Sequence, residues 1–181
     1  MSKKRVLFII EQLTHGGAER VVVELARRID RERFEPYVCC LREEGKLADE
    51  LKAAGVPVFC LHKRRPFDLR MLLRLKKKLK ELRIDIVHTH LFTARLWGCL
   101  AAKMAGVRRI ITSEHSIDVG LGGFRRFVDQ RVLRWSDLVV AKADAIAQYL
   151  AESKKIPTDR IAVVPNGVDI EKYGKSERAQ V

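Results

Sequence analysis

The chain has 181 residues, enough for one mid-sized domain and too few for two of ordinary size. With 47% hydrophobic residues it can build a packed core, and 11 glycines and 5 prolines exclude collagen-like and low-complexity classes. The 36 lysines and arginines against 23 acidic residues give a formal net charge of +13, which favours anionic partners. No apolar run approaches the roughly 20 residues of a membrane span, and we expect no secretory signal.

Cysteine usage fits the same picture. Cys39, Cys40, Cys60 and Cys99 form no C-x-x-C pair. Because no secretory signal is expected, we interpret all four as reduced, buried thiols and expect a cytoplasmic location.

Short apolar runs alternate with segments of helical periodicity along the chain. Strict alternation of this kind predicts an α/β fold, with a doubly wound, mostly parallel, seven-stranded, Rossmann-like sheet in a single domain over residues 1–165. Residues 166–181 read as a polar linker or tail. We expect strands at 5–10, 34–41, 56–61, 84–88, 109–112, 138–141 and 161–164, and helices at 18–29, 46–54, 67–82, 93–104, 124–135 and 143–152.

The histidines all follow strands in this scheme. Ligands of such sheets bind at the carboxyl ends of strands, near the point where the strand order reverses. A Rossmann order makes the first and fourth strands neighbours, so His15 and His90 are expected to face one crevice. The histidines concerned are His15, His62, His88, His90 and His115.

Each histidine also has a plainer interpretation. His88 reads as a strand-end histidine bonded to backbone, His62 as part of a solvated basic loop, and His15 as a loop residue or a ligand contact. His88 and His90 share a strand face but lack a third ligand, so we expect no metal. His115 has the strongest functional case, because it follows Glu114 on a loop after a central strand.

Gly16 and Gly17 lie between the first strand and the first helix. Paired glycines let backbone approach a ligand, and a helix start offers free N–H groups to an anion. The alternative is a simple tight turn. The spacing matches neither the dinucleotide nor the P-loop fingerprint.

The helix at 67–82 carries many lysines and arginines on one side. This side is either an ordinary solvated face or a patch for acidic lipid head groups. Nucleic acid is disfavoured, because no stacking aromatics are interleaved with the basic residues.

Four motifs in order resemble family-4 retaining glycosyltransferases of the GT-B fold. They cover nearly the whole chain. They are Gly-Gly-Ala-Glu-Arg at 16–20, Asp-Ile-Val-His-Thr-His at 85–90, Ser-Glu-His-Ser at 113–116 and Val-Pro-Asn-Gly-Val-Asp at 164–169.

The resemblance implies roles for these positions. His115 lies by the reacting sugar as the catalytic residue, and Gly16 and Gly17 approach the donor diphosphate or the acceptor. We add to the substrate-binding residues His15, Glu19, His90 and Glu114. The interdomain hinge is implied at Pro165, Asn166, Gly167 and Asp169. Where relatives often carry serine after the sixth strand, this chain has Lys142 between two alanines.

The resemblance covers only the first, acceptor-side half of such an enzyme. The donor is a nucleotide-diphosphate sugar, no cofactor or metal is implied, and the acceptor is a lipid-linked or saccharide hydroxyl. The implied partner is a C-terminal donor-binding domain, and the basic helix at 67–82 leaves an acidic surface at the inner face of the membrane as an alternative partner. We expect little activity from this chain alone and self-association through an uncovered face. Two alternatives stay open: a subunit of a split transferase, and a non-catalytic binding or scaffold module.

Overall fold

A computed structural model describes residues 3–117 and 122–167, and it contains a sheet of seven strands that all pair in parallel. Their order is β3-β2-β1-β4-β5-β6-β7, so the order reverses between β1 and β4 and the predicted doubly wound fold is confirmed. The strands are β1 (Lys4–Gln12), β2 (Phe34–Glu43), β3 (Val58–Cys60), β4 (Ile86–His90), β5 (Arg109–Glu114), β6 (Leu138–Ala141) and β7 (Ile161–Val163).

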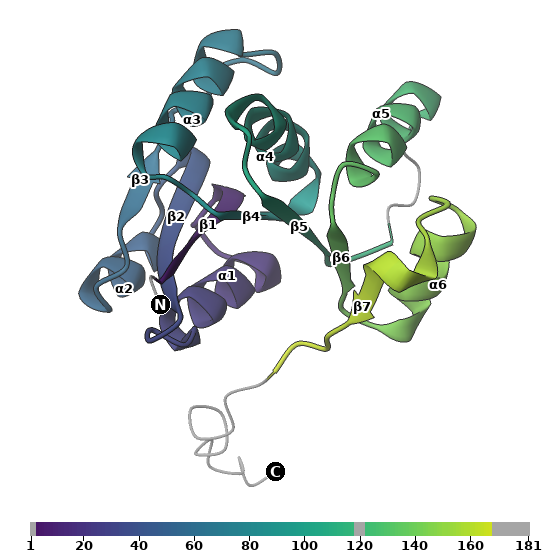
Figure 1. Cartoon of the computed structure of the whole chain (residues 1–181), viewed down its shortest axis with the longest axis horizontal. Helices are drawn as coiled ribbons and strands as arrows, with labels where there is room; N and C mark the ends of the chain where they lie inside the picture. The colour runs from purple at the N-terminus through teal and green to yellow at the C-terminus, as the bar shows by residue number, and fades with distance from the viewer. Residues whose placement is uncertain (1–2, 118–121, 168–181) are drawn as a thin grey trace, which may run out of the picture.

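Helices cover both faces of the sheet (Figure 1). Helices α3, α4 and α5 lie on one face and α1, α2 and α6 on the other. A short 3₁₀ turn (Thr158–Arg160) precedes β7. The helices are α1 (Gly17–Arg28), α2 (Leu47–Ala53), α3 (Leu69–Glu81), α4 (Leu91–Ala105), α5 (Gly123–Leu133) and α6 (Asp144–Glu152).

Alternation along β1 divides the core into two layers. Leu7 and Ile9 pack into the cluster that contains α3 and α4, whereas Phe8 and Ile10 pack into the cluster that contains α1 and α2. All four side chains are at least 97% buried, because a central parallel strand is covered on both faces. The continuous apolar run of this strand follows from that position.

Strand β4 lies two residues later than the sequence predicts. Ile84 is buried and donates its N–H to the carbonyl of Leu79, so it belongs to the turn that ends α3. Asp85 accepts a 3.0 Å hydrogen bond from the backbone of Arg5 and sits before the strand. The strand therefore ends at His90, and both histidines of the motif lie within it.

Strand β5 is two residues longer than predicted and ends at Glu114. The prediction that Glu114 lies on a loop is therefore wrong. Its backbone pairs with Ala141 of β6, and this pairing extends β5 to the rim formed by the carboxyl ends of the strands.

The thiols are free, but they are not all buried. Cys39, Cys40 and Cys99 are buried, whereas Cys60 at the end of the edge strand β3 is half-buried. Burial raises the pKa of all four thiols, most strongly for the fully enclosed Cys39. In residues 3–117 and 122–167, no helix is long and apolar enough to cross a membrane.

Candidate functional site

Three imidazoles gather at the carboxyl ends of β4 and β5. His88 and His90 are two apart on β4 and so share a face, with ring centroids 4.4 Å apart. His90 Nδ1 lies 3.1 Å from His115 Nε2, so the two rings share a hydrogen bond. His90 is fully buried and His115 is half-buried. The expectation that histidines after neighbouring strands gather at one rim holds for His90 and His115.

The partner of His88 differs from the prediction. Its Nε2 lies 2.9 Å from the hydroxyl of Ser113 on β5, rather than against backbone. The ring also packs against Phe8, its register partner on β1. These contacts fix the side-chain orientation from both neighbouring strands.

The imidazoles of this cluster are neutral. Burial, reinforced by the Lys142 ammonium, lowers the pKa of His115 to about 4. Burial also lowers the pKa of His88, followed by Lys142 and His115. Burial lowers the pKa of His90 as well, followed by the two neighbouring imidazoles and then Lys142. Neutral rings can donate and accept hydrogen bonds, so the cluster can hold a hydroxyl or phosphate oxygen without carrying charge.

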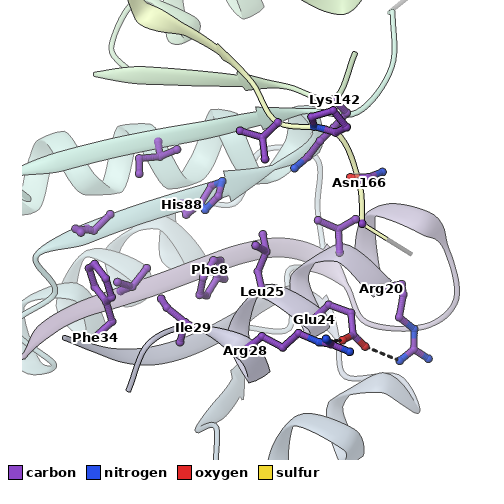
Figure 2. Close-up of a pocket in the computed structure, with 17 residues that line it drawn as sticks. Phe8, Arg20, Glu24, Leu25, Arg28, Ile29, Phe34, His88, Lys142 and Asn166 are labelled. Atoms are coloured by element: carbon purple, nitrogen blue, oxygen red, sulfur yellow. Dashed lines mark hydrogen bonds and ion pairs between the residues drawn. The ribbon is translucent and has the colours of Figure 1, made fainter. Parts of the chain in front are cut away.

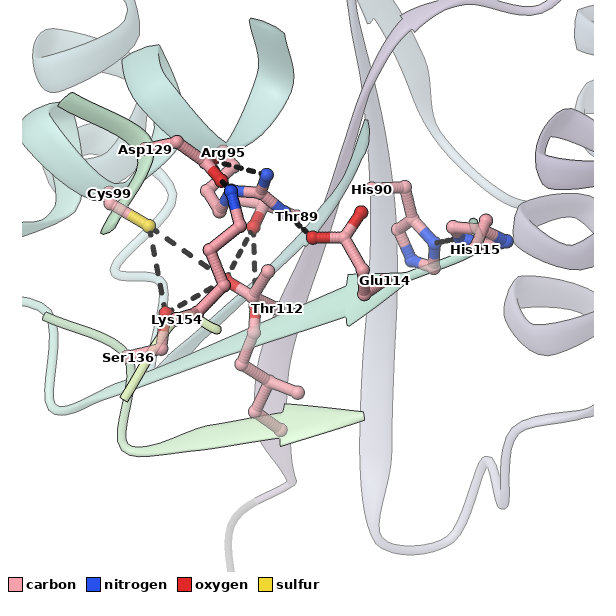
Figure 3. Close-up of polar contacts among 11 residues, drawn as sticks. Thr89, His90, Arg95, Cys99, Thr112, Glu114, His115, Asp129, Ser136 and Lys154 are labelled. Carbon is pink, nitrogen blue, oxygen red and sulfur yellow. Dashed lines mark hydrogen bonds and ion pairs between the residues drawn. The ribbon is translucent and has the colours of Figure 1, made fainter. Parts of the chain in front are cut away.

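Glu114 belongs to a buried ion cluster (Figure 3). The guanidinium of Arg95 on α4 donates to Glu114 at 2.6 Å and to Asp129 of α5. The ammonium of Lys154, after α6, donates to Asp129 at 2.5 Å. Two cations thus face two anions, and none of the four is more than 4% exposed. The cluster ties α4, α5 and the segment after α6 to the end of β5, so Glu114 positions this rim.

A hydroxyl chain lies behind the ion cluster. Thr112 lies 2.9 Å from the hydroxyl of Thr89 and 2.8 Å from that of Ser136. All three residues are buried, and their mutual bonds satisfy polar groups that would otherwise be costly inside the α4 layer.

The diglycine forms the start of α1. Gly16 is the N-cap residue with φ 157° and ψ 164°, a region that is essentially restricted to glycine. A Cβ at Gly16 would collide with the carboxylate of Glu19, whereas a Cβ at Gly17 would meet nothing within 4 Å. Glu19 is buried and lies back over the helix start. The diglycine therefore links β1 to the start of α1, with the Glu19 side chain beside it.

The other predicted residues lie outside this cluster. His15 and His62 are exposed after β1 and β3, and among the described residues neither contacts the three imidazoles. Pro165, Asn166 and Gly167 are exposed after β7. Asp169 lies outside the described residues.

A groove of about 540 Å³ lies on the α1 face of the sheet. Figure 2 shows Phe8, Leu25 and Phe34 on one side of it and Lys142 and Asn166 on the other. Its floor is formed by residues of β1, β4 and β5, and α1 lies along one side. The groove is mainly apolar and includes the half-buried His88.

Sequence reasoning missed two cations of this region. Lys142 directly follows β6, the same position relative to its strand that His115 holds after β5, and this rule could have found it. Arg95 lies in the apolar helix α4. Its burial could have been suspected because mostly apolar residues surround it in the sequence of that helix. In the described ranges, no group of three histidine, cysteine, aspartate or glutamate side chains is arranged to hold a metal.

Comparison with known proteins identifies the family. The profile of Glycosyltransferase Family 4 matches residues 15–172. The chain belongs to Glycosyltransferase Family 4. It is 30% identical over 170 residues to an Escherichia coli UDP-Gal:alpha-D-GlcNAc-diphosphoundecaprenol alpha-1,3-galactosyltransferase, and this match covers 87% of the chain and 43% of the relative. It is 32% identical over 117 residues to a Campylobacter jejuni GalNAc-transferase that acts on a PP-undecaprenol glycan, covering 62% and 32% of the two.

Solved structures share the fold of this family-4 domain. A glycosyltransferase from Rickettsia africae superposes with a TM-score of 0.77 at 21% identity, over 96% of this chain and 45% of that one. Anabaena HepE in complex with UDP gives 0.76 at 20% identity, over 95% and 46%. The chain thus spans about half the length of the glycosyltransferases that it matches, and it corresponds to one Rossmann-like half of a GT-B fold.

Proposed function

We propose that this family-4 domain is the acceptor-side half of a retaining glycosyltransferase. The complete enzyme moves a sugar from a nucleotide-diphosphate donor to a hydroxyl of a lipid-linked acceptor. The observation that carries the proposal is the rim beside the reversal of strand order, where the start of α1 and the His90–His115 pair follow β1, β4 and β5. The printed activities of the Escherichia coli and Campylobacter jejuni relatives support the undecaprenol-linked acceptor class.

The start of α1 suits the donor side of this reaction. Charge develops on the departing diphosphate, and preorganised N–H groups stabilise such charge. Gly16 and Gly17 leave the backbone there uncovered by side chains of their own. The departing phosphate oxygen takes the proton of the acceptor hydroxyl, so no strong protein base is needed.

His115 suits a positioning and polarising role at the reacting sugar. Its ring is neutral and half-buried, and the hydrogen bond to His90 fixes its orientation. A neutral imidazole donates a hydrogen bond without competing for the acceptor's proton. We expect His115→Ala in the two-domain enzyme to lower turnover sharply with little loss of folding.

A membrane-facing surface on the α3–α5 layer supports a lipid-linked acceptor. Phe67 beside α3 and Phe124 on α5 are each 78% exposed, and Phe127 is 54% exposed. Exposed arginines flank these side chains. Because helices that follow parallel strands begin at the same rim of the sheet, the starts of α3 and α5 lie on one side of the molecule. Apolar side chains among cations are typical of a surface that lies on acidic lipid. We place this surface at the inner, acidic face of the membrane. The exposed cations near the starts of α3 and α5 are Arg64, Arg65, Arg70, Arg74, Arg125 and Arg126.

Vesicle flotation of the purified chain tests this surface. We expect binding to vesicles with phosphatidylglycerol, loss of binding in neutral vesicles, and weakening with salt, because each juxtamembrane cation contributes about 1 kcal/mol. Titration with uridine, guanosine and adenosine diphosphate sugars should show no tight binding to this half alone. Tight nucleotide binding, or equal binding to neutral vesicles, contradicts the proposal.

A matched pair of variants localises the surface. Phe124→Ser on α5 should reduce flotation several-fold, whereas Leu25→Ser on α1, on the opposite face of the sheet, should not. Equal losses in both variants would place the lipid contact elsewhere.

The groove on the α1 face suits a protein partner. We propose that a C-terminal donor-binding domain completes the enzyme and that the uncovered groove makes the isolated chain self-associate. Sedimentation velocity over a concentration series should show a rising mean mass that Leu25→Ser reduces. Nucleotide release on mixing with a separate donor-domain chain would favour the split-enzyme alternative, and a chain that binds lipid yet never supports transfer would favour a scaffold.

A further inference from the structure

His90 contains a polar atom that the candidate site leaves unexplained. Its Nδ1 bonds to His115, but its Nε2 is buried and has no hydrogen-bond partner among the described residues. The ring is enclosed by His88 at 4.4 Å and Phe8 at 6.2 Å between ring centroids, and neither ring bonds to this nitrogen. An unpaired buried nitrogen is costly in free energy. The His90–His115 pair therefore adopts whichever of its two tautomeric arrangements costs less.

The two arrangements differ in which ring donates. In the first, His90 Nδ1–H donates to His115 Nε2, so the sealed His90 Nε2 is a bare lone pair and His115 carries its proton on Nδ1. In the second, His115 Nε2–H donates, and His90 buries an N–H without an acceptor. A doubly protonated His90 is excluded, because burial and the charge of Lys142 keep the ring neutral.

Burial differs between the two rings and decides the arrangement. His115 is half-buried, and in the described part of the chain the buried nitrogen without a partner is Nε2 of His90, so Nδ1 of His115 is not sealed in the same way. His90 is fully buried, and an orphaned N–H is rarer in folded proteins than an under-used acceptor. The charged group acting on both rings is the Lys142 ammonium, and positive potential favours a lone pair at the sealed nitrogen.

We propose that His90 is a positioning residue that fixes His115 as the Nδ1–H tautomer, so that His115 presents a hydrogen-bond donor to an oxygen of the substrate. His90 itself touches no substrate. Its contribution is to hold the His115 ring and to remove the alternative tautomer, in which Nδ1 would be a lone pair facing an oxygen. The substrate part of this inference rests on the proposed function, whereas the tautomer does not.

Nitrogen-15 chemical shifts of the histidine rings in the purified chain test the proposal without substrate. At pH 7 we expect His115 to show a protonated Nδ1 and a bare Nε2. His90→Phe keeps the ring volume and removes the donor, so His115 should revert toward the Nε2–H tautomer that free histidine prefers. His90→Asn keeps an N–H near the Nδ1 position, so it should preserve the Nδ1–H signature.

A control variant separates the bond from general loosening of the cluster. Ser113→Ala removes the 2.9 Å contact to His88 but leaves the His90–His115 bond, so the tautomer of His115 should not change. An Nε2–H His115 in the unsubstituted chain overturns the proposal. So does an unchanged tautomer in folded His90→Phe, or its loss in folded His90→Asn. Failure of vesicle binding would leave these shifts unaffected, so the two proposals fail separately.

Discussion

Glu114 and His115 are consecutive in the chain, yet their side chains lie on opposite faces of the sheet. Glu114 bonds to Arg95 in the α4 layer, and His115 bonds to His90 on the α1 side. The alternation of a strand end produces this division. Glu114 anchors the rim from inside the α4 layer, and His115 is half-buried on the opposite face.

The Arg95 ion cluster should dominate local stability. Arg95→Met leaves Glu114 and Asp129 facing only one buried cation, and breaking a buried pair in this way costs about 3–5 kcal/mol. Arg109→Met is the matched control, since Arg109 lies 3.5 Å from Asp137 but is 69% exposed, and such pairs contribute about 0–1 kcal/mol. Urea unfolding measures both, and equal effects would contradict the assignment.

Stability should fall as pH decreases through the histidine range. Unfolded histidine titrates near pH 6.5, whereas the folded pKa of His115 is about 4, that of His88 about 3, and that of His90 well below its usual value. The unfolded state therefore binds more protons below pH 6.5. As the pH falls below 6.5, each ring that stays neutral in the folded chain lowers the unfolding free energy by up to about 1.4 kcal/mol per pH unit. The effect of the half-buried His115 is smaller.

Urea unfolding at pH 7, 6 and 5 checks this slope. His88→Phe removes one titrating ring and should make the slope shallower. A free energy of unfolding that stays constant from pH 7 to 5 would show that the rings titrate in the folded chain as they do in the unfolded chain, and it would contradict the lowered pKa values.

The two glycines before α1 should respond differently to substitution. Gly16→Ala places a methyl group against Glu19 at a backbone conformation that alanine avoids, at a cost of about 1–3 kcal/mol. Gly17→Ala meets open space at a helical position and should stabilise the chain by about 0.4–1 kcal/mol. Thermal unfolding of both variants measures the difference, and a Gly16→Ala chain as stable as the parent would refute it.

Thiol reactivity should follow burial. Cys60 is half-buried and should react with Ellman's reagent first, though slowly, because burial raises its pKa. Cys39, Cys40 and Cys99 should react only as the chain unfolds. Cys60→Ser should abolish the native-state reaction, and a fast second thiol in that variant would contradict the burial of the others.

The fold was predictable because its signals are local. The apolar run of β1 and the spacing of α1 each identify an element without reference to the rest of the chain. The boundaries of β4 and β5 could not be predicted in this way, because they depend on contacts between distant segments, such as Asp85 with Arg5 and Glu114 with Ala141.

The site was predictable in part for the same reason. The position of His90 and His115 after neighbouring strands follows from topology, and the structure brings them together. The ion cluster around Glu114 could not be foreseen, since Arg95, Asp129 and Lys154 come from α4, α5 and the segment after α6, whose packing no local pattern encodes. The exposure of His15 depends likewise on how its loop leaves β1.

The buried ammonium of Lys154 makes this residue a chemical reporter of local opening between α5 and the segment after α6. Because it lies 2.5 Å from Asp129 and only 1% of the residue is exposed, acylating reagents that label the outer lysines of α3 do not reach it in the folded chain. Its labelling, read by mass spectrometry, therefore counts the molecules in which the segment after α6 has parted from α5, even while the rest of the sheet stays intact.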